Sequence, residues 1–317
     1  MSFFGSNFLS YSIIIPVYNA MSYIDALKRN IFSFLASPFN IEVIIVDDGS
    51  VDGCSAILEN ISDIIYVKQN NQGVSCARNI GISLASNDYL IFFDSDDDLD
   101  VGLFSFLDSL NNKEDVIFFN YKINGFEVNL LLNNAIFSGN DIFHLFLNKK
   151  ITLTICGLVV KKSFLNRNSI FFDINYPLGE DIMFLFKIFI FSKKVSYYSG
   201  SYFNYNLKDG GAAKSFIDYR KSRMLEPFLI FKDNYKLHED LLESYNFYLV
   251  TLYLYLLKNS FIYGVKDKES AKFIIDFSYL LKIKTNHVDF YYTSFKFLFK
   301  FGYIFAYYFI LLFRRRN

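Results

Sequence analysis

Acidic side chains are concentrated in one short segment of the chain. Five aspartates fall within the seven residues 94–100, directly after the apolar run Tyr89–Phe93. Two carboxylates that lie two residues apart at a strand end, as Asp94 and Asp96 do, can offer oxygen ligands to one Mg²⁺ or Mn²⁺ ion. Such a cation commonly also binds a substrate diphosphate. The alternative is an acidic loop that only faces solvent.

Two further acidic pairs occur, and each has a structural alternative. Asp47 and Asp48 precede a Gly-Ser pair, so they either form an ordinary turn or accept hydrogen bonds from the base or ribose of a nucleotide. Glu180 and Asp181 begin an apolar stretch with helical spacing. Acidic residues stabilise a helix N-terminus without any further function, but a carboxylate that faces the metal site could act as a general base.

One basic side chain lies in a position suited to an anion. Arg78 comes near the start of a predicted helix, five residues beyond Gly73, where a guanidinium could pair with a phosphate. The alternative is an ordinary surface arginine. No GxGxxG or GxxxxGK[ST] pattern follows the first predicted strand, which removes support for a dinucleotide site or a P-loop.

The elements that position these residues alternate between short apolar runs and longer stretches with helical spacing. This alternation predicts an α/β fold with a parallel sheet that is buried on both faces, and ligands bind beyond the carboxyl ends of such strands. The predicted strands of the first half are 12–17, 41–46, 64–68, 89–93 and 116–121, and the predicted helices are 22–36, 52–61, 75–86 and 101–112. Later we expect helices at 140–148 and 181–192, strands at 155–161 and 195–206, and mostly helices after residue 210.

Composition narrows the class of protein. The 317 residues carry 32 basic and 32 acidic side chains, and this balance argues against a nucleic-acid partner. A hydrophobic fraction of 52% excludes a disordered chain. The mean hydropathy of +0.22, with 39 Phe and 24 Tyr, indicates contact with a membrane or a partner. Three widely spaced cysteines and an N-terminus without the pattern of a signal peptide fit a reducing, cytoplasmic setting.

Five segments, in this order, resemble the family 2 glycosyltransferases with the GT-A fold. They are residues 12–19 (SIIIPVYN), 46–52 (VDDGSVD), 71–81 (NQGVSCARNIG), 94–97 (DSDD) and 179–181 (GED). The resemblance covers roughly residues 10–200. It implies a GT-A type α/β fold, with a mostly parallel, doubly wound sheet and a mostly helical C-terminal extension. It also implies inverting transfer of a hexose or N-acetylhexosamine from a nucleotide diphosphate donor, commonly a UDP-sugar.

The resemblance assigns roles to individual residues. The residues that it places around the nucleotide sugar are Pro16, Tyr18, Asp47, Asp48, Asn71, Arg78, Asp94 and Ser95. The residues that it makes candidate ligands of Mn²⁺ or Mg²⁺ are Asp94, Asp96 and Asp97. Asp181 looks like the base that deprotonates the acceptor hydroxyl, and Glu180 beside it would orient the acceptor or the base. A single displacement of this kind needs no covalent intermediate.

The C-terminal residues 290–316 form a separate feature. Residues 301–313 are an unbroken apolar or aromatic run of thirteen, followed by three arginines. A spanning helix needs about 20 apolar residues, so we expect a helix that lies on an anionic membrane surface. The alternative is a terminal helix packed on the protein. Together with the family resemblance, this predicts a peripheral or monotopic enzyme at the cytoplasmic face of the bacterial inner membrane.

A membrane-surface glycosyltransferase suggests a lipid-linked saccharide acceptor. A polyprenyl-diphosphate-linked glycan of O-antigen and lipopolysaccharide assembly is the first expectation, with capsule or lipooligosaccharide as alternatives. A catalytically inactive scaffold and a nucleotidyltransferase are the competing classes, although the latter would carry a Gly-rich basic loop after the first strand. We expect a catalytic domain over residues 1–209 and a helical extension over 210–317.

Overall fold

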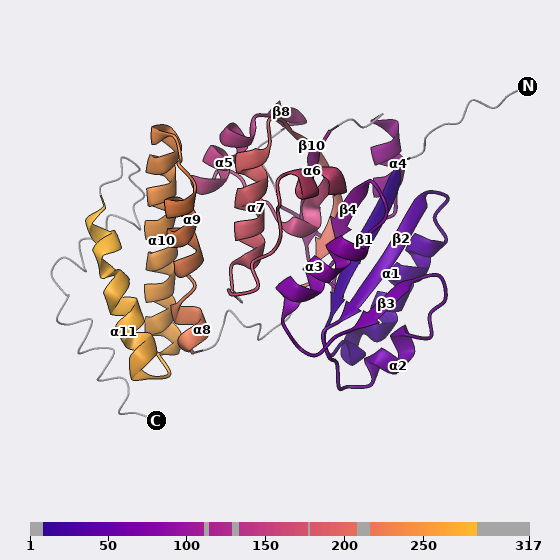
Figure 1. The fold of residues 1–317 in the computed structure, drawn as a ribbon, viewed down its shortest axis with the longest axis horizontal. Helices are drawn as coiled ribbons and strands as arrows, with labels where there is room; N and C mark the ends of the chain where they lie inside the picture. Colours follow the sequence, from indigo (N-terminus) through magenta and orange to yellow (C-terminus); the bar gives the residue numbers. More distant parts are fainter. Residues whose placement is uncertain (1–8, 111–113, 129–132, 177, 208–215, 284–317) are drawn as a thin grey trace, which may run out of the picture. The chain divides into compact units, whose positions relative to one another are not determined.

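The computed structural model describes residues 9–110, 114–128, 133–176, 178–207 and 216–283 (Figure 1). The chain forms two compact units. The first contains residues 1–143 and 151–207, and the second contains residues 144–150 and 208–317. The domain boundary expected between residues 209 and 210 falls outside the described residues and stays a prediction. The expected membrane-binding segment 290–316 also lies outside them.

A mixed sheet forms the centre of the first unit. Its strands follow the order β3-β2-β1-β4-β9-β6-β10-β5, and β7 and β8 pair with β6 and β10. The strands of the first half are β1 (Ser10–Val17), β2 (Asn40–Asp47), β3 (Ile65–Lys68), β4 (Tyr89–Phe92) and β5 (Asp98–Leu99). The later strands are β6 (Val116–Ile123), β7 (Phe126–Glu127), β8 (Ala135–Phe137), β9 (Leu158–Lys161) and β10 (Val195–Tyr205).

The first four strands are parallel, as the sequence predicts. Ile14 of β1 pairs with Ile44 of β2 on one side and with Phe92 of β4 on the other, and all three side chains are buried. Beyond β4, strand β9 runs antiparallel to both of its neighbours, and β10 again runs parallel to β6. The short strands β5, β7 and β8 also pair antiparallel with their neighbours, so the predicted α/β architecture is confirmed with a sheet that is mixed beyond β4.

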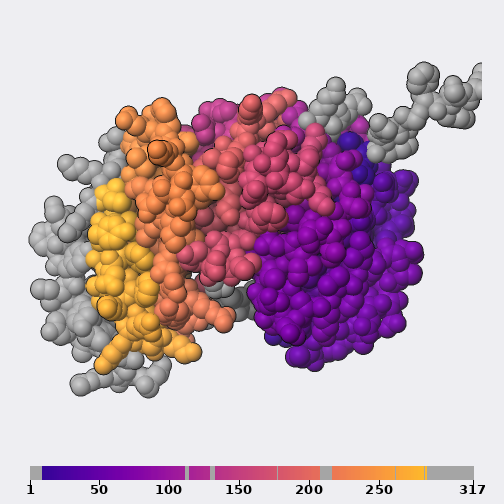
Figure 2. Space-filling model, viewed as in Figure 1, coloured from indigo at the N-terminus to yellow at the C-terminus, as the bar shows by residue number. Residues whose placement is uncertain are grey.

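Helices cover both faces of the parallel part of the sheet. The chain moves from β1 to β2 and β3, and then crosses back over β1 to reach β4 on its other side. Because each crossover between parallel strands is right-handed, the helices that precede this change of direction lie on one face of the sheet and the helix that makes the return crossover lies on the other. The helices concerned are α1 (Ile24–Leu35), α2 (Cys54–Leu58), α3 (Val74–Leu84) and α4 (Gly102–Ser109). Phe34 of α1 contacts Phe93 edge to face, with ring centroids 5.5 Å apart. These elements, indigo to purple, pack closely against one another in Figure 2.

Helix α7 (Glu180–Phe191) packs on the same face as α3. Phe184 of α7 meets Phe92 of β4 at 5.4 Å, and the ring of Phe172 stacks on Phe184 at 4.0 Å. A left-handed residue, Gly179 with φ of +81°, precedes the helix. The aromatic contacts fix the N-terminal end of α7 beside the carboxyl end of β4. Helix α6 (Lys162–Arg167) also belongs to the first unit, and the residues of α5 (Gly139–Leu147) are divided between the two units.

The second unit is helical where it is described, as the sequence predicts after residue 210. It contains α8 (Tyr219–Ser222), α9 (Glu226–Asn234), α10 (Glu239–Tyr263), α11 (Lys268–Asp276) and a 3₁₀ helix over Phe277–Lys282. Buried tyrosines tie these helices together, because Tyr245 of α10 donates to the carbonyl of Phe228 and Tyr253 donates to that of Ile274. Among the described residues, none of the helices combines the length and the apolar character needed to cross a bilayer.

A glycine sets the distance between α3 and the sheet. A Cβ built on Gly81 would lie 2.3 Å from Cγ2 of Ile14, closer than two carbons can approach. The helix can therefore pack this tightly on β1 only where residue 81 has no side chain.

Replacing Gly81 with alanine should consequently destabilise the protein. Gly-to-Ala in a helix normally stabilises by about 0.5–1 kcal/mol, but here overpacking should cost about 1–3 kcal/mol. Urea unfolding of Gly81→Ala measures this, with Ser83→Ala on the exposed side of the same helix as the control. A Gly81→Ala variant as stable as the control would contradict the packing argument.

Candidate active site

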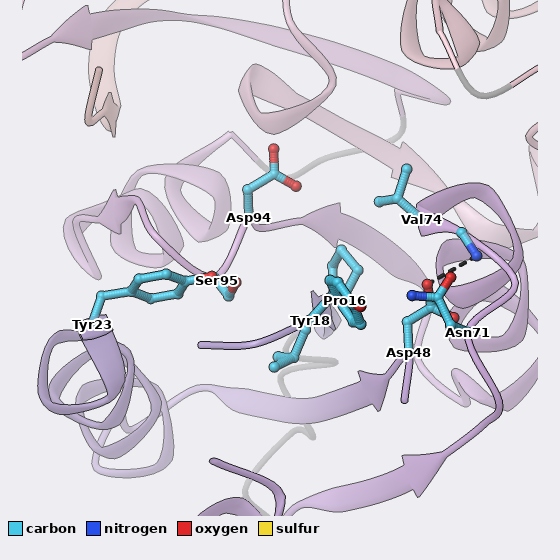
Figure 3. A pocket seen from close by; sticks show the side chains of 10 residues that line it. Pro16, Tyr18, Tyr23, Asp48, Asn71, Val74, Asp94 and Ser95 are labelled. Carbon is cyan, nitrogen blue, oxygen red and sulfur yellow. Dashed lines mark hydrogen bonds between the residues drawn. The ribbon is translucent and has the colours of Figure 1, made fainter. Parts of the chain in front are cut away.

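A cavity of about 340 Å³ lies at the carboxyl ends of the parallel strands (Figure 3). The residues that line it are Pro16, Val17, Tyr18, Tyr23, Asp48, Asn71, Gly73, Val74, Asp94 and Ser95. Six of them, all except Val17, Tyr23, Gly73 and Val74, are among the residues that the sequence placed around a nucleotide sugar. In Figure 3, Asp48 and Asn71 lie on one side of the cavity, Asp94 lies apart from them, and Pro16 and Tyr18 lie between.

Asp48 holds the loop that forms one wall of the cavity. Its Oδ1 accepts hydrogen bonds from the Gln69 side chain at 2.6 Å and from the Gln72 amide at 2.7 Å. Its Oδ2 accepts from the amide of Gly73 at 2.9 Å. Gly73 has φ of +91° and directly precedes α3, so the Asp48 carboxylate fixes both the loop and the start of that helix. Tyr18 is 49% exposed beside it and offers a ring face to a ligand.

Asp47 does not line the cavity. Its carboxylate is fully buried and accepts hydrogen bonds from the Ser50 amide at 2.8 Å, the Tyr66 hydroxyl at 2.8 Å and the Ser55 hydroxyl. Burial alone would raise the pKa of Asp47, but the hydrogen bonds from Ser55 and Ser50 outweigh it and hold this pKa below its usual value. Asp47 therefore stabilises the turn that follows β2.

Arg78 also lies outside the cavity lining. Its guanidinium is buried, with NH2 at 2.8 Å from Asp94 Oδ1 and NH1 at 3.3 Å from Glu180 Oε1. The guanidinium also lies over the ring of Phe172, 5.3 Å from its centroid. Burial tends to lower the pKa of Arg78, but the charge and hydrogen bond of Asp94, together with Cys156 and Glu180, raise this pKa above its usual value, so the group stays a cation. Its described partners are carboxylates of the site itself.

Asp94, Asp97 and Cys156 form a group that could hold a metal ion. One ligand atom from each residue lies within 4.8 Å of the others. Asp97 is 1% exposed, and its Oδ2 has no hydrogen-bond partner among the described residues. Two carboxylates fit Mg²⁺ or Mn²⁺, whereas the Cys156 thiol, whose pKa burial raises well above the ordinary value, stays protonated and is a poor ligand for such cations.

Asp96, the third predicted metal ligand, lies outside this group. Its backbone carbonyl accepts a hydrogen bond from the side chain of Asn206 at 3.1 Å. Asn206 also donates its backbone amide to Asp97 Oδ1 at 2.8 Å and its side-chain amide to Asp98 at 2.9 Å. One residue at the end of β10 therefore holds three consecutive residues of the acidic loop.

Glu180 and Asp181 occupy the first turn of α7, near Arg78. Asp181 Oδ1 accepts from the amide of Ile182 at 2.7 Å. Burial raises the pKa of Asp181, and the Ile182 amide and Arg78 oppose this only in part. The pKa of Glu180 is likewise raised, by burial first and then by the charge of Asp181, although the positive charge of Arg78 lowers it in part. A carboxylate with a raised pKa is a better proton acceptor, which suits a general base.

The sequence did not single out several residues of this site. Tyr23 and Val74 line the cavity, and Cys156 and Asn206 contact the acidic loop from 62 and 109 residues further along the chain. Cys156 Sγ lies 3.5 Å from Asp94 Oδ2. Val74 lies within the motif segment 71–81, although no role was predicted for it. The other three belong to no short motif, so only the fold identifies them.

The cavity lies at the carboxyl edge of an α/β sheet, and comparison with known proteins gives the family. Residues 12–171 match the model of glycosyl transferase family 2. The match covers half of the chain, and the chain belongs to this family. The resemblance noted from the five sequence motifs is thereby confirmed.

Three related proteins are named as a glycosyltransferase or for teichoic acid biosynthesis. The glycosyltransferase GlyA of Streptococcus pneumoniae is 28% identical over 228 residues, which are 64% of this chain and 31% of that protein. The minor teichoic acid biosynthesis protein GgaB of Bacillus subtilis is 31% identical over 64% of this chain and 23% of its own length. The matched regions thus span less than a third of either relative. GgaA of Bacillus subtilis, another minor teichoic acid biosynthesis protein, is 28% identical over 90% of this chain and 71% of its own length.

A solved structure agrees with the fold. The Staphylococcus aureus TarS fragment 1–349, crystallised with UDP-GlcNAc, superposes with a TM-score of 0.67 at 21% identity, over 84% of this chain and 79% of the fragment. This similarity confirms the predicted GT-A-like fold with its helical C-terminal region.

The buried Asp97 should make stability depend on pH. Burial, and then the neighbouring acids Asp94, Asp96 and Asp98, raise its pKa to about 8, although the Asn206 amide lowers it. The unfolded chain ionises this group near pH 4, so the folded state loses stability as the pH rises towards 8, by up to about 1.4 kcal/mol per pH unit.

Thermal unfolding in EDTA between pH 4 and 9 measures this effect. The loss of stability between about pH 4 and 8 should be smaller in Asp97→Asn, where the raised pKa values of Asp181 and Glu180 still contribute, and unchanged in Asp63→Asn, which changes an exposed acid. Equal pH profiles for the unaltered protein and Asp97→Asn would rule out the raised pKa.

Proposed function

We propose that this protein transfers a hexose or N-acetylhexosamine from a UDP-sugar to a surface saccharide by a single inverting displacement. The observation that carries the proposal is the cavity that brings Pro16, Tyr18, Asp48, Asn71 and Asp94 together at the carboxyl edge of a family 2 fold. The TarS fragment with a similar fold was crystallised with UDP-GlcNAc and with UDP, which supports a uridine nucleotide donor.

The chain's own residues suggest how the donor is bound. The exposed ring of Tyr18 can stack on the base, and the Asp48 and Asn71 side chains lie beside it to accept or donate hydrogen bonds. Asp94, at 31% side-chain exposure, lies at the far side of the cavity, where the sugar diphosphate would reach. The cavity therefore matches a ligand with an aromatic end and a charged end.

The acidic loop fits a divalent cation, because Asp97, whose Oδ2 has no hydrogen-bond partner among the described residues, lies near the partly exposed Asp94. Asp94, Asp96 and Asp97 are the proposed ligands of Mn²⁺ or Mg²⁺. When bound, the cation would neutralise charge on the diphosphate. The protein's contribution is to keep these acids in place through the hydrogen bonds that Asn206 donates to the loop.

Asp181 is the proposed general base, and Glu180 orients it or the acceptor. The raised pKa of Asp181 favours uptake of the proton that the acceptor hydroxyl loses as it attacks the anomeric carbon. Attack opposite the diphosphate leads to inversion without a covalent intermediate. Both residues lie at the start of α7 and are only partly exposed, which restricts the motion of their side chains.

The acceptor class rests on the relatives. GgaA and GgaB are named for teichoic acid biosynthesis, and TarS is named a poly(ribitol-phosphate) β-N-acetylglucosaminyltransferase, so a surface polymer or its lipid-linked precursor is favoured. Within that class we propose a polyprenyl-diphosphate-linked glycan of O-antigen assembly, at an anionic membrane surface on the cytoplasmic face. Precursors of capsule or lipooligosaccharide are the alternative acceptors, and the transfer reaction would be the same.

Nucleotide release from a panel of UDP-, GDP- and TDP-sugars tests the proposal. We expect release of UDP from one donor, increased by Mn²⁺, abolished by EDTA and increased by a lipid-diphosphate-GlcNAc acceptor. A parallel assay with poly(ribitol-phosphate) separates the two acceptor classes. Turnover that requires a GDP- or TDP-sugar would refute the donor assignment, and release unaffected by EDTA would refute the metal role.

The Asp181→Asn substitution tests the base. It preserves the shape of the side chain but removes its ability to take a proton, so kcat should fall about 10²–10⁴-fold while UDP binding stays within about 3-fold. Asp25→Asn, an exposed acid in the first turn of α1, is the matched control and should leave kcat unchanged. Near-normal transfer by Asp181→Asn would show that another group is the base.

A further inference from the structure

Three charged side chains from three separate elements meet beneath the cavity. Arg78 from α3 lies between Asp94, which follows β4, and Glu180, the first residue of α7. The guanidinium reaches one carboxylate at 2.8 Å and the other at 3.3 Å, through different nitrogens. The Arg78 side chain is 5% exposed and the Glu180 side chain 13%, so both charges are largely removed from water.

We propose that Arg78 is a positioning residue that fixes Asp94 and Glu180 relative to one another, and that it does not bind the donor phosphates. This inference rests on the proposed function, since it assigns Asp94 to the donor site and Glu180 to the side of the base.

The burial of this network is the first argument. A buried carboxylate that loses its cation is left with an uncompensated charge, which is strongly unfavourable. If the guanidinium moved to a phosphate in the cavity, Glu180 would lose its described cation while remaining buried. A planar guanidinium can hold two carboxylates at fixed angles because its donors form a rigid fork. Arg78 therefore suits a fixed bridge better than a movable clamp.

The neighbouring residue makes a second link between the same elements. Asn79 donates its side-chain amide to the Phe172 carbonyl at 2.9 Å and accepts from the Phe172 amide at 2.9 Å. The Phe172 ring lies under the Arg78 guanidinium on one side and stacks on Phe184 of α7, nearly parallel at 3°. Helix α3 thus contacts α7 through an ion pair and through an aromatic stack.

The two links fix a distance that the reaction needs. Asp94 lies at the donor end of the cavity, and Glu180 immediately precedes the proposed base. A displacement of about 1 Å between reacting groups can lower a rate about 10²-fold. Loss of the bridge should therefore reduce the rate of the chemical step more than it reduces donor affinity.

A double-variant cycle tests the proposal. We expect Arg78→Gln to lower kcat about 10²-fold and Arg78→Lys, which keeps the charge without the fork, about 10-fold. UDP affinity in Mn²⁺ should change by less than about 3-fold in both. Glu180→Gln combined with Arg78→Gln should be no slower than the slower single variant, because both changes break the same bridge. Arg29→Gln, an exposed arginine of α1, is the control.

Contrary outcomes are equally specific. If Arg78 contacts a phosphate, Arg78→Gln should weaken UDP binding at least 10-fold while uridine binding stays constant. The decreases in kcat caused by Arg78→Gln and by Glu180→Gln should then multiply in the double variant. Either result overturns the proposal. Should Arg78→Gln fold poorly, Arg78→Lys decides by the same two measurements. The comparison of UDP and uridine binding needs no turnover, so it tests the role of Arg78 even if the unaltered protein transfers no sugar. A lack of transfer by the unaltered protein would contradict the proposed function, and not the role of Arg78.

Discussion

The reversal of strand order beside β1 is the constraint on which the site depends. Strands β2 and β4 flank β1, and the chain reaches them by crossovers on opposite faces of the sheet. Helices that leave in opposite directions cannot cover the carboxyl end of β1, so a crevice opens there. The side chains just beyond β1, β2 and β4 line this crevice, and Tyr18, Asp48 and Asp94 are among them.

The remaining structure serves to hold the walls of that crevice. Asp48 fastens the loop before α3, Asn206 fastens the acidic loop after β4, and Gly81 allows α3 to lie against Ile14. Each of these contacts joins segments that are distant in the sequence. Backbone hydrogen bonds and close packing therefore position part of the site, and the Arg78 ion pairs to Asp94 and Glu180 position the rest.

Much of the first half of the fold could be predicted from the sequence, because its strands are continuous apolar runs and its helices have clear spacing. The predicted strand 41–46 and the observed β2 (Asn40–Asp47) differ by one residue at each end. The reversed direction of β9 could not be predicted, since an apolar run of four residues carries no information about which neighbour it pairs with.

The site shows the same division. Residues that follow directly after strands, such as Asp48 and Asp94, were found because a parallel sheet brings its carboxyl ends together. The different roles of Asp47 and Asp48 were not predictable, because adjacent residues of a strand point to opposite sides and only the fold tells which side faces the cavity. One partner of Arg78, Glu180, lies in α7 and is 102 residues away in the sequence, so no local pattern could predict this contact.

The hydrogen bonds to Asp48 limit how it can meet a nucleotide. An ionised carboxylate has about four lone-pair directions in which it can accept a proton. Two at Oδ1 are taken by Gln69 and Gln72, and one at Oδ2 is taken by Gly73. A single lone-pair direction on Oδ2 is left, so Asp48 can accept one hydrogen bond from a hydroxyl or an N–H of a bound nucleoside. To accept hydrogen bonds from both ribose hydroxyls, Asp48 would first have to lose one of its hydrogen bonds from the loop.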